Sequence, residues 1–249
     1  MLKIVVLFIF LHTVAVSFSQ TAEIVLSKYF DAIGNKCEWS KLKTRIDKYV
    51  TSRASTIPNE FTTLIDYQNV VFYKVVKRKD SINLVRYFSI DENTPYDTST
   101  SSFNGKDYWF QFNSNNPVRT TFDLKSVKLN SILSHADVFF NAEKILLIGN
   151  EKIENTLCNI LRLTINNREF DYYFDFNSNY LIMYHPKESN VKTRLLDYRK
   201  VQGLMIPFKE EIFNQYGLIS SNLLVDIQFN KSIDDHYFDK LVGEGLIIK

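Results

Sequence analysis

Histidine is the side chain best suited to acid–base or metal chemistry near neutral pH, and three of the four histidines lie beyond the first twenty residues. His135, His185 and His236 are too far apart in sequence to form a paired metal-ligand motif, and the chain contains no H-E-x-x-H or Gly-x-Ser-x-Gly sequence. His185 stands directly before Pro186, which fits a solvated turn at the end of a strand. The histidines therefore predict no metal centre and no catalytic triad.

Asp234 and Asp235 directly precede His236, and this is the arrangement most similar to an acid–base group. Aspartates also cap turns by bonding to nearby backbone groups, and we consider that the better interpretation. We therefore expect a protein that is not an enzyme and that uses no cofactor or metal.

Cys37 and Cys158 are the only cysteines, and their wide separation fits neither a metal motif nor a disulfide framework. Two alternatives remain for them. They form a single disulfide in an oxidising compartment, or they are two buried thiols that behave as small hydrophobic groups.

The chain begins with the features of a secretory signal peptide. Lys3 supplies a positive charge, an unbroken apolar run extends over Ile4–Leu11, and the small residues Ser17 and Ser19 follow. This run is much shorter than the ~20 residues that a membrane-spanning helix needs. We expect cleavage after Ser19, a single exported domain over residues 20–249, and no integral membrane segment.

Acidic and basic side chains are interspersed, and the formal net charge is +2. The densest basic cluster, KVVKRKD at residues 74–80, is short and fits the solvated end of a β-hairpin. A nucleic-acid-binding protein needs a clear basic face, so we expect no nucleic-acid partner.

The predicted elements begin with a helix. In TAEIVLSKYFDAIGNK the apolar residues recur at helical spacing, Thr21 can cap the start and Gly34 can end the helix. A short second helical turn is predicted over Cys37–Thr44, and a helix or helical loop between Lys125 and Lys144. The apolar side of that later helix carries Ile132, Ala136 and Phe139.

From Arg45 onward the apolar period changes to two, which is typical of strands with one buried and one solvated face. FDYYFDFN, KDYWFQFN, LRLTI and NLLVDIQFN alternate in this way, and Asn-rich turns separate such segments. A large open sheet would leave its apolar face bare and two edges unpaired. We therefore predict one α+β domain, in which a single strongly curved antiparallel sheet forms a half-open β-barrel with helices on its concave side. In the strands quoted, the expected apolar faces include Phe170, Tyr172, Phe174 and Phe176, and Leu223, Val225, Ile227 and Phe229.

Gly203 and Pro207 separate two predicted strands, the first of which covers Arg194–Val201. Gly203 is the residue of its turn that takes a positive φ without steric cost. Pro207 lacks an N–H group and therefore belongs at the start or edge of the following strand. The stretch predicts a hairpin.

Several short motifs follow one another along the chain: Ala32–Asn35; Asn104, Gly105, Lys106 and Trp109; Gly149, Glu151 and Ile153; Tyr173 and Asp175; Asp197, Tyr198, Arg199, Gly203 and Pro207; and Ile233, Asp234, Asp235 and Phe238. Their order resembles exported proteins of the LolA-like group, which include outer-membrane lipoprotein-sorting and lipoprotein-carrier-like proteins. The resemblance covers nearly the whole chain after the signal peptide. It implies a LolA/LolB-like half-barrel, a periplasmic location or a peripheral one at the outer membrane, and acyl chains of lipids or lipoproteins as partners, with envelope proteins as further candidates.

The aromatic content, 14 Tyr and 20 Phe, has two interpretations. The aromatic rings fill the core, or the half-closed sheet leaves an apolar cavity for an acyl chain, and the resemblance favours the cavity. The alternatives for function are thus a lipid or lipoprotein carrier or sensor, and a periplasmic scaffold or interaction module of the same fold with a filled core. Expected cavity residues are Phe110, Phe112, Leu163, Tyr172 and Phe174, whereas Asp107, Gln111, Asp171 and Asp175 have the opposite parity and are expected to face water.

Overall fold

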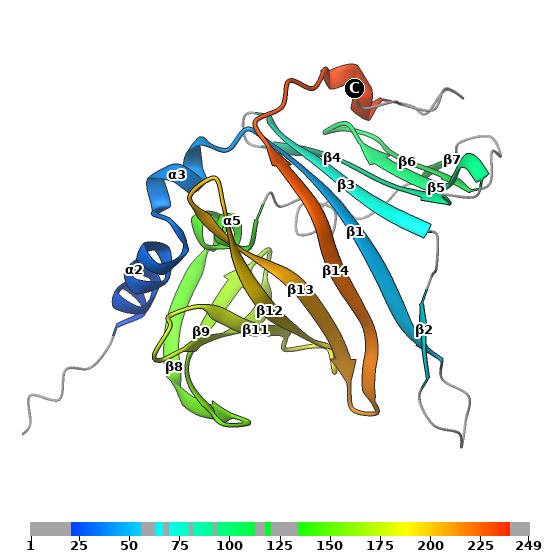
Figure 1. The fold of residues 1–249 in the computed structure, drawn as a ribbon. Coiled ribbons are helices and arrows are strands. Elements are labelled where there is room, and N and C mark those ends of the chain that lie inside the picture. The colour runs from blue at the N-terminus through cyan, green and yellow to red at the C-terminus, as the bar shows by residue number, and fades with distance from the viewer. Residues whose placement is uncertain are drawn as a thin grey trace, which may run out of the picture.

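The computed structural model describes residues 21–55, 63–66, 70–79, 82–91, 94–112, 118–120 and 134–239, so the predicted signal peptide and Ile132 lie outside the described residues. Figure 1 shows a broad curved sheet with the blue and green helices gathered on one side and the red helix near the C-terminus apart from them. The helices are α2 (Ala22–Ile33), α3 (Lys36–Lys41), α5 (His135–Asn141) and the 3-10 helix η1 (Asp235–Phe238). The strands are β1 (Thr44–Ser55), β2 (Thr63–Asp66), β3 (Val70–Lys79), β4 (Ile82–Asp91), β5 (Thr94–Phe103), β6 (Tyr108–Phe112), β7 (Val118–Thr120), β8 (Lys144–Ile153), β9 (Thr156–Ile165), β10 (Arg168–Asp175), β11 (Leu181–Pro186), β12 (Lys192–Val201), β13 (Leu204–Asn214) and β14 (Gly217–Phe229).

Helix α2 has the ends that its sequence predicts. The Thr21 side chain accepts a hydrogen bond from the Ile24 N–H, which satisfies one of the free donors of the first turn. Gly34 ends the helix in the left-handed region at φ 111°, where a residue without Cβ is favoured. The predicted start and stop of this helix are confirmed.

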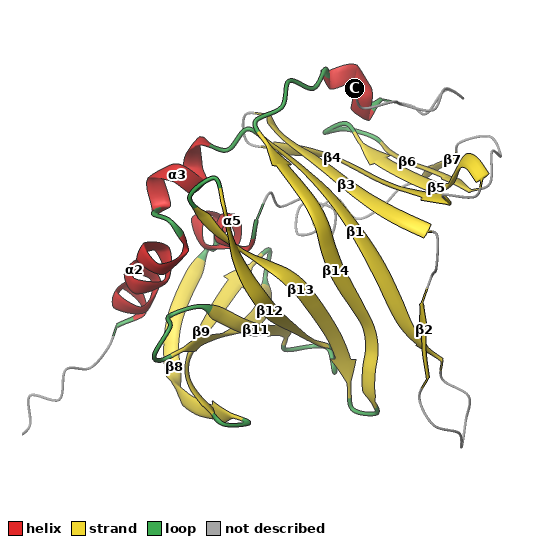
Figure 2. Ribbon diagram, viewed as in Figure 1, coloured by secondary structure: helices red, strands yellow, loops and turns green. Residues whose placement is uncertain are grey.

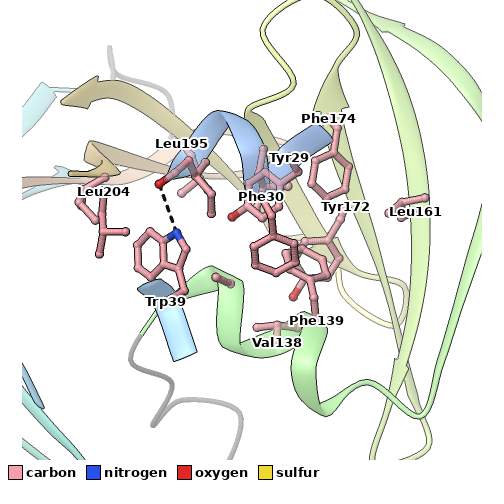
Figure 3. Close-up of a cluster of buried hydrophobic side chains, with 14 of the residues drawn as sticks. Tyr29, Phe30, Trp39, Val138, Phe139, Leu161, Tyr172, Phe174, Leu195 and Leu204 are labelled. Carbon is pink, nitrogen blue, oxygen red and sulfur yellow. Dashed lines mark hydrogen bonds between the residues drawn. The ribbon is translucent and has the colours of Figure 1, made fainter. Parts of the chain in front are cut away.

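Helix α3 follows after a sharp reversal at Asn35, which has a φ of 76° and whose side chain accepts from the Cys37 N–H. The Trp39 indole N–H donates to the Ile33 carbonyl at 3.2 Å and so fixes α3 against the end of α2 (Figure 3). Cys37 is exposed on α3, whereas Cys158 is buried in β9, and both are free thiols. The structure therefore contains no bond between these two cysteines.

The strands form one 14-stranded sheet, in which every described pair is antiparallel (Figure 2). The order is β7-β6-β5-β4-β3-β1-β14-β13-β12-β11-β10-β9-β8, with β2 paired to β1. Successive strands are neighbours within β3–β7 and within β8–β14, and β1 joins these two runs at the centre by pairing with both β3 and β14. The path ends at β7 and β8 without joining them, so the predicted half-open, strongly curved sheet is confirmed.

The main core lies on the concave face of the half that contains β8–β14, where α2, α3 and α5 cover it (Figures 1 and 3). Tyr29 on α2 contacts the rings of Phe139 and Phe174 with centroid separations of 5.4 and 5.1 Å. Phe139 also meets Tyr172 edge-on at 5.3 Å. These aromatic contacts place the helices inside the curve, as predicted.

A bulge corrects the expected face of β14. Lys48 of β1 pairs with Asp226 and Tyr49 pairs with Leu224, so Val225 is left without an opposite residue. One extra residue inverts the alternation of the strand. Ile227 is buried as expected, but Val225 and its neighbour Leu223 are exposed, and Leu224 packs against the core in their place.

The expectation that Asp171 faces water is wrong. Asp171 has the predicted outward parity on β10, yet it is only 4% exposed. Its two carboxylate oxygens accept hydrogen bonds from Arg162 at 2.7 and 2.9 Å, which satisfies the buried charge. Phe176, expected on the apolar face, is also placed differently, because it follows the end of β10 and is exposed.

The other half of the sheet carries a smaller core on its opposite face. Val75, Leu84 and Phe88 pack there beneath Phe238 of η1. Asp234 caps η1 by accepting from the His236 N–H, and Asp235 forms salt bridges with Lys77 and Lys79. The acidic pair therefore has the capping and anchoring role that we preferred to acid–base chemistry.

The predicted hairpin at Gly203 is present. Val201 pairs with Leu204, and the two central residues, Gln202 and Gly203, have φ values of 50° and 89°, as in a type I′ turn. Pro207 lies inside β13 and not at its start, but the pairing of β13 with β14 begins only at Lys209. At Pro207, β13 is therefore paired with β12 only, so this part of the strand is an edge.

Candidate functional site

A cavity of about 280 Å³ remains on the concave side, between the central strands of the sheet and α5. The main hydrophobic core adjoins the cavity, because Phe208, Tyr184 and Leu224 belong to both. Charged and polar lining residues are Arg45, Asp47, Lys74, Ser134, His135, Glu210 and Asn222. Apolar and aromatic lining residues are Tyr49, Tyr87, Tyr184, Pro207, Phe208 and Leu224.

Strands β1 and β3 supply the charged wall of the cavity. Arg45 and Asp47 are two positions apart on β1, so they share a face, and Arg45 Nε lies 2.7 Å from Asp47 Oδ1. Lys74 of β3 is the cross-strand partner of Asp47 in the ladder. Three charged side chains are thereby brought to one wall by strand pairing alone.

Among the described residues, the Lys74 ammonium has an aromatic neighbour and no ionic one within contact distance. It lies 5.7 Å from the centroid of the Tyr87 ring, at the range of a cation–π interaction. Among the described residues, none forms a hydrogen bond or salt bridge with it. Desolvation lowers the pKa of Lys74, and the charge of Asp47 only partly opposes this effect.

Glu210 of β13 and His135 of α5 face each other across the cavity wall. His135 Nε2 is 3.4 Å from Glu210 Oε1, and the His135 ring lies 5.2 Å from that of Tyr184. Desolvation alone would raise the pKa of Glu210. The hydrogen bond with His135 and the charges of His135, Lys74 and Arg45 outweigh it, so the pKa of Glu210 is lowered.

Ser134 precedes α5 and is 5% exposed. Its hydroxyl does not cap the helix. Within the described structure, the Ser134 Oγ atom has no hydrogen-bond partner although it is shielded from solvent. A buried hydroxyl without a partner is costly, and this one lines the cavity.

Part of the cavity wall is aromatic. Tyr49 stacks on Phe72 with a centroid separation of 5.6 Å, and Tyr184 stacks on the core residue Tyr172 at 5.6 Å. Burial raises the pKa values of Tyr49 and Tyr184, so both phenols are neutral at physiological pH. Leu224, which the β14 bulge turns inward, extends this apolar wall.

The arrangement can bind a molecule that has both an apolar part and a charged part. Within the described ranges, the His, Cys, Asp and Glu side chains form no group of three or more that could hold a metal ion. The three described histidines lie apart: His135 contacts Glu210, His185 contacts Tyr173, and His236 contacts Asp239.

The five residues predicted to line a cavity fall into different places. Leu163, Tyr172 and Phe174 are buried together in the core beneath the helices. Phe110 on β6 lies opposite Ser101, which pairs with Tyr87, so it shares the concave face of the cavity residue Tyr87 as predicted, but it is 42% exposed and lies outside that core. Phe112 ends β6, and its side chain is outside the described part of the chain. None of the five lines the 280 Å³ cavity.

The basic cluster KVVKRKD contains a sequence signal for the charged wall. Alternation from Lys74 places Val76 and Arg78 on the same face and Val75 and Lys77 on the other. Lys77 indeed binds Asp235 on the far side of the sheet, whereas Arg78 binds Asp137 of α5 on the concave side. The cluster is therefore divided between the two faces of β3 and is not simply a solvated end.

The sequence matches no known family model, and it matches none of the curated proteins. Solved structures share its fold. A LolA superfamily protein from Nitrosomonas europaea has a TM-score of 0.58 at 16% identity, over 89% of this chain and 99% of that one. A DUF1329 family protein from Desulfovibrio piger has a TM-score of 0.59 at 12% identity, over 88% and 97% of the two chains.

A putative outer membrane lipoprotein-sorting protein domain from Vibrio parahaemolyticus is also similar, with a TM-score of 0.57 at 8% identity over 88% of this chain and 96% of that domain. At such identities the likeness concerns the fold. The chain therefore has the LolA-like fold that its motif order predicted. None of its described helices combines the length and the apolarity that crossing a bilayer requires.

Proposed function

We propose that the protein is an exported, non-enzymatic carrier or sensor that binds a lipid, or the acyl chain of a lipoprotein, in the concave side of its half-barrel. The observation that carries this proposal is the cavity of about 280 Å³ between α5 and the central strands, with its aromatic and aliphatic wall. The shared fold with a putative lipoprotein-sorting domain supports it.

The size of the cavity limits the ligand. Small-molecule pockets are typically about 300–1,000 Å³, so a cavity of about 280 Å³ suits part of one chain and not several chains. Each methylene that enters an apolar environment contributes about 0.8 kcal/mol. A single acyl chain that lies against Leu224, Phe208 and Tyr184 would gain affinity in this way.

The proposal places the protein in the periplasm after removal of residues 1–19, either free or at the inner surface of the outer membrane, where envelope proteins would be its further partners.

The alternative function is a scaffold of the same fold. The filled aromatic core around Tyr29, Phe139 and Phe174 favours that alternative, because helices already occupy much of the concave face.

Lipid extraction and native mass spectrometry of the purified protein distinguish the two functions. A carrier is expected to retain lipid at near-stoichiometric amount. Titration with a fluorescent fatty acid then tests the position of the ligand. Leu224→Asp is expected to weaken binding at least tenfold, because it places a charge on the apolar wall of the cavity.

Leu223→Asp is the matched control, since Leu223 is the neighbouring leucine and is exposed on the other side of β14. It is expected to bind like the wild type. A milder variant, Leu224→Gln, and thermal melting of all variants separate lost binding from lost folding. If the wild type neither retains lipid nor binds the probe, the carrier function is rejected and the scaffold function remains.

A further inference from the structure

We propose that the cavity contains an anion subsite, where the Lys74 ammonium and the Ser134 hydroxyl bind the carboxylate or phosphate group of an amphiphile. The inference rests on the proposed function and narrows it from any lipid to an anionic one. The apolar chain of the same ligand would lie against Leu224, Phe208 and Tyr184.

The first observation is that the part of the chain that the structure describes supplies no salt-bridge partner for Lys74. Its cross-strand neighbour Asp47 is engaged by Arg45 at 2.7 Å. Only the face of Tyr87 accompanies its ammonium within the described residues. A lysine withdrawn from water loses hydration that a bound anion would restore.

The second observation concerns Ser134, on a separate segment of the chain. Its side chain is almost fully buried, it lines the same cavity, and its hydroxyl has no partner among the described residues. Lys74 and Ser134 both have a hydrogen to donate. One oxygen-rich anion would satisfy the two donors together.

The acidic residues of the cavity do not serve as the anion that binds Lys74. The Asp47 carboxylate is paired with Arg45, and the Glu210 carboxylate faces His135 at 3.4 Å. Each acid therefore has a basic neighbour of its own, and the ammonium of Lys74 remains as the free charge of the described wall. Desolvation of Lys74, which lowers its pKa, agrees with a group held in place for a ligand.

The test compares amphiphiles that share one chain and differ in the head group: dodecanoate, dodecyl phosphate and the neutral dodecanol. Each displaces a neutral fluorescent probe from the full-length exported protein at neutral pH. The wild type is expected to bind the two anions at least tenfold more tightly than dodecanol, and the ratio between the anions identifies the preferred group.

Lys74→Met keeps the length of the side chain and removes its charge, so it is expected to abolish the preference for anions while dodecanol binds as before. Ser134→Ala is expected to reduce the preference in part. Lys48→Met is the matched control, because Lys48 lies on the adjacent strand β1 and alternates to the opposite face from Asp47 and Tyr49.

Three results have distinct meanings. Loss of the preference in Lys74→Met, a partial loss in Ser134→Ala and no change in Lys48→Met support the subsite. Equal affinity of the wild type for all three compounds, or an unchanged preference in Lys74→Met, overturns the subsite and leaves the proposed function intact. If none of the three compounds binds the wild type, the subsite and the proposed function both fail.

Discussion

Gly34 lies directly against Gly203. A Cβ atom on Gly34 would be 2.6 Å from the Gly203 carbonyl oxygen, a distance that real Cβ atoms do not show. The end of α2 therefore rests on the β12–β13 turn at a point where Gly34 has no room for a side chain, although the Cβ position of Gly203 itself is open. This contact fixes the first helix of the domain on the sheet.

Gly34→Ala is expected to destabilise the protein by about 3 kcal/mol or more, because it adds overpacking to a strained positive φ. Gly217→Ala provides the control. Gly217 also has a positive φ, at 126°, but nothing lies within 4 Å of its Cβ position, so about 1–2 kcal/mol is expected from strain alone. Chemical denaturation measures both, and equal losses would show that the contact with Gly203 is unimportant.

Gln202→Asn is expected to stabilise the protein by about 0.5–1 kcal/mol. Gln202 has a positive φ in a two-residue hairpin turn, and Asn before Gly is the preferred pair for such turns. Gln215→Asn is the control, since Gln215 is also exposed in a turn but has no positive φ. A lower melting temperature for Gln202→Asn than for the wild type would contradict the turn type.

Phe174→Ala is expected to cost about 3–5 kcal/mol, as truncations of buried aromatic residues do. Phe174 is 1% exposed and packs against Tyr29 and Phe139. Phe176→Ala, two positions further along and exposed, is expected to cost less than about 1 kcal/mol. Similar losses of unfolding free energy in the two variants would mean that Phe174 borders open space.

Lys74→Met is expected to stabilise the folded protein by on the order of 1 kcal/mol, whereas Lys48→Met leaves it unchanged. The folded-state pKa of Lys74 is lowered by desolvation, and Arg45 adds to this while Asp47 and Glu210 oppose it. The folded state therefore binds the proton less tightly than the unfolded state, and the penalty is greatest below the folded pKa.

As pH rises through the folded pKa of Lys74, its ammonium loses the proton and the penalty begins to fall, and the penalty is gone once pH exceeds the unfolded pKa. The difference in unfolding free energy between Lys74→Met and the wild type is thus expected to shrink between neutral pH and about pH 10.5. Denaturant titrations at several pH values measure it. A variant that is less stable than the wild type at neutral pH would show that Lys74 stabilises the fold.

Local patterns were sufficient to predict the helix at Thr21–Gly34, the antiparallel strands and the hairpin at Gly203. Capping and alternation depend on residues close together in the sequence, so they can be recognised without a structure. The position of α5 beside Glu210 could not be predicted from local patterns. α5 and Glu210 are far apart in the sequence, and only the folded sheet brings them together.

The face of β14 shows a second limit. Leu223 and Leu224 are adjacent and chemically identical, and only the bulge at Val225 decides which of them reaches the cavity. The bulge is defined by pairing with β1, which is remote in sequence. For the same reason the cavity residues Arg45, Lys74 and Glu210 cannot be recognised as a group from the sequence, because three separate strands bring them together.

The pairing of β1 with β14 also affects how the chain can reach its native state. β3–β7 and β8–β14 each contain hairpins between successive strands, which can form as soon as those strands are available. The seam between Thr44–Ser55 and Gly217–Phe229 joins the two ends of the domain, and long loops must close before it forms. We expect the two halves to gain structure early and their joining to be slow. A nascent or truncated chain that lacks the last strand would carry two exposed sheet edges with no partner, which is the state most open to aggregation.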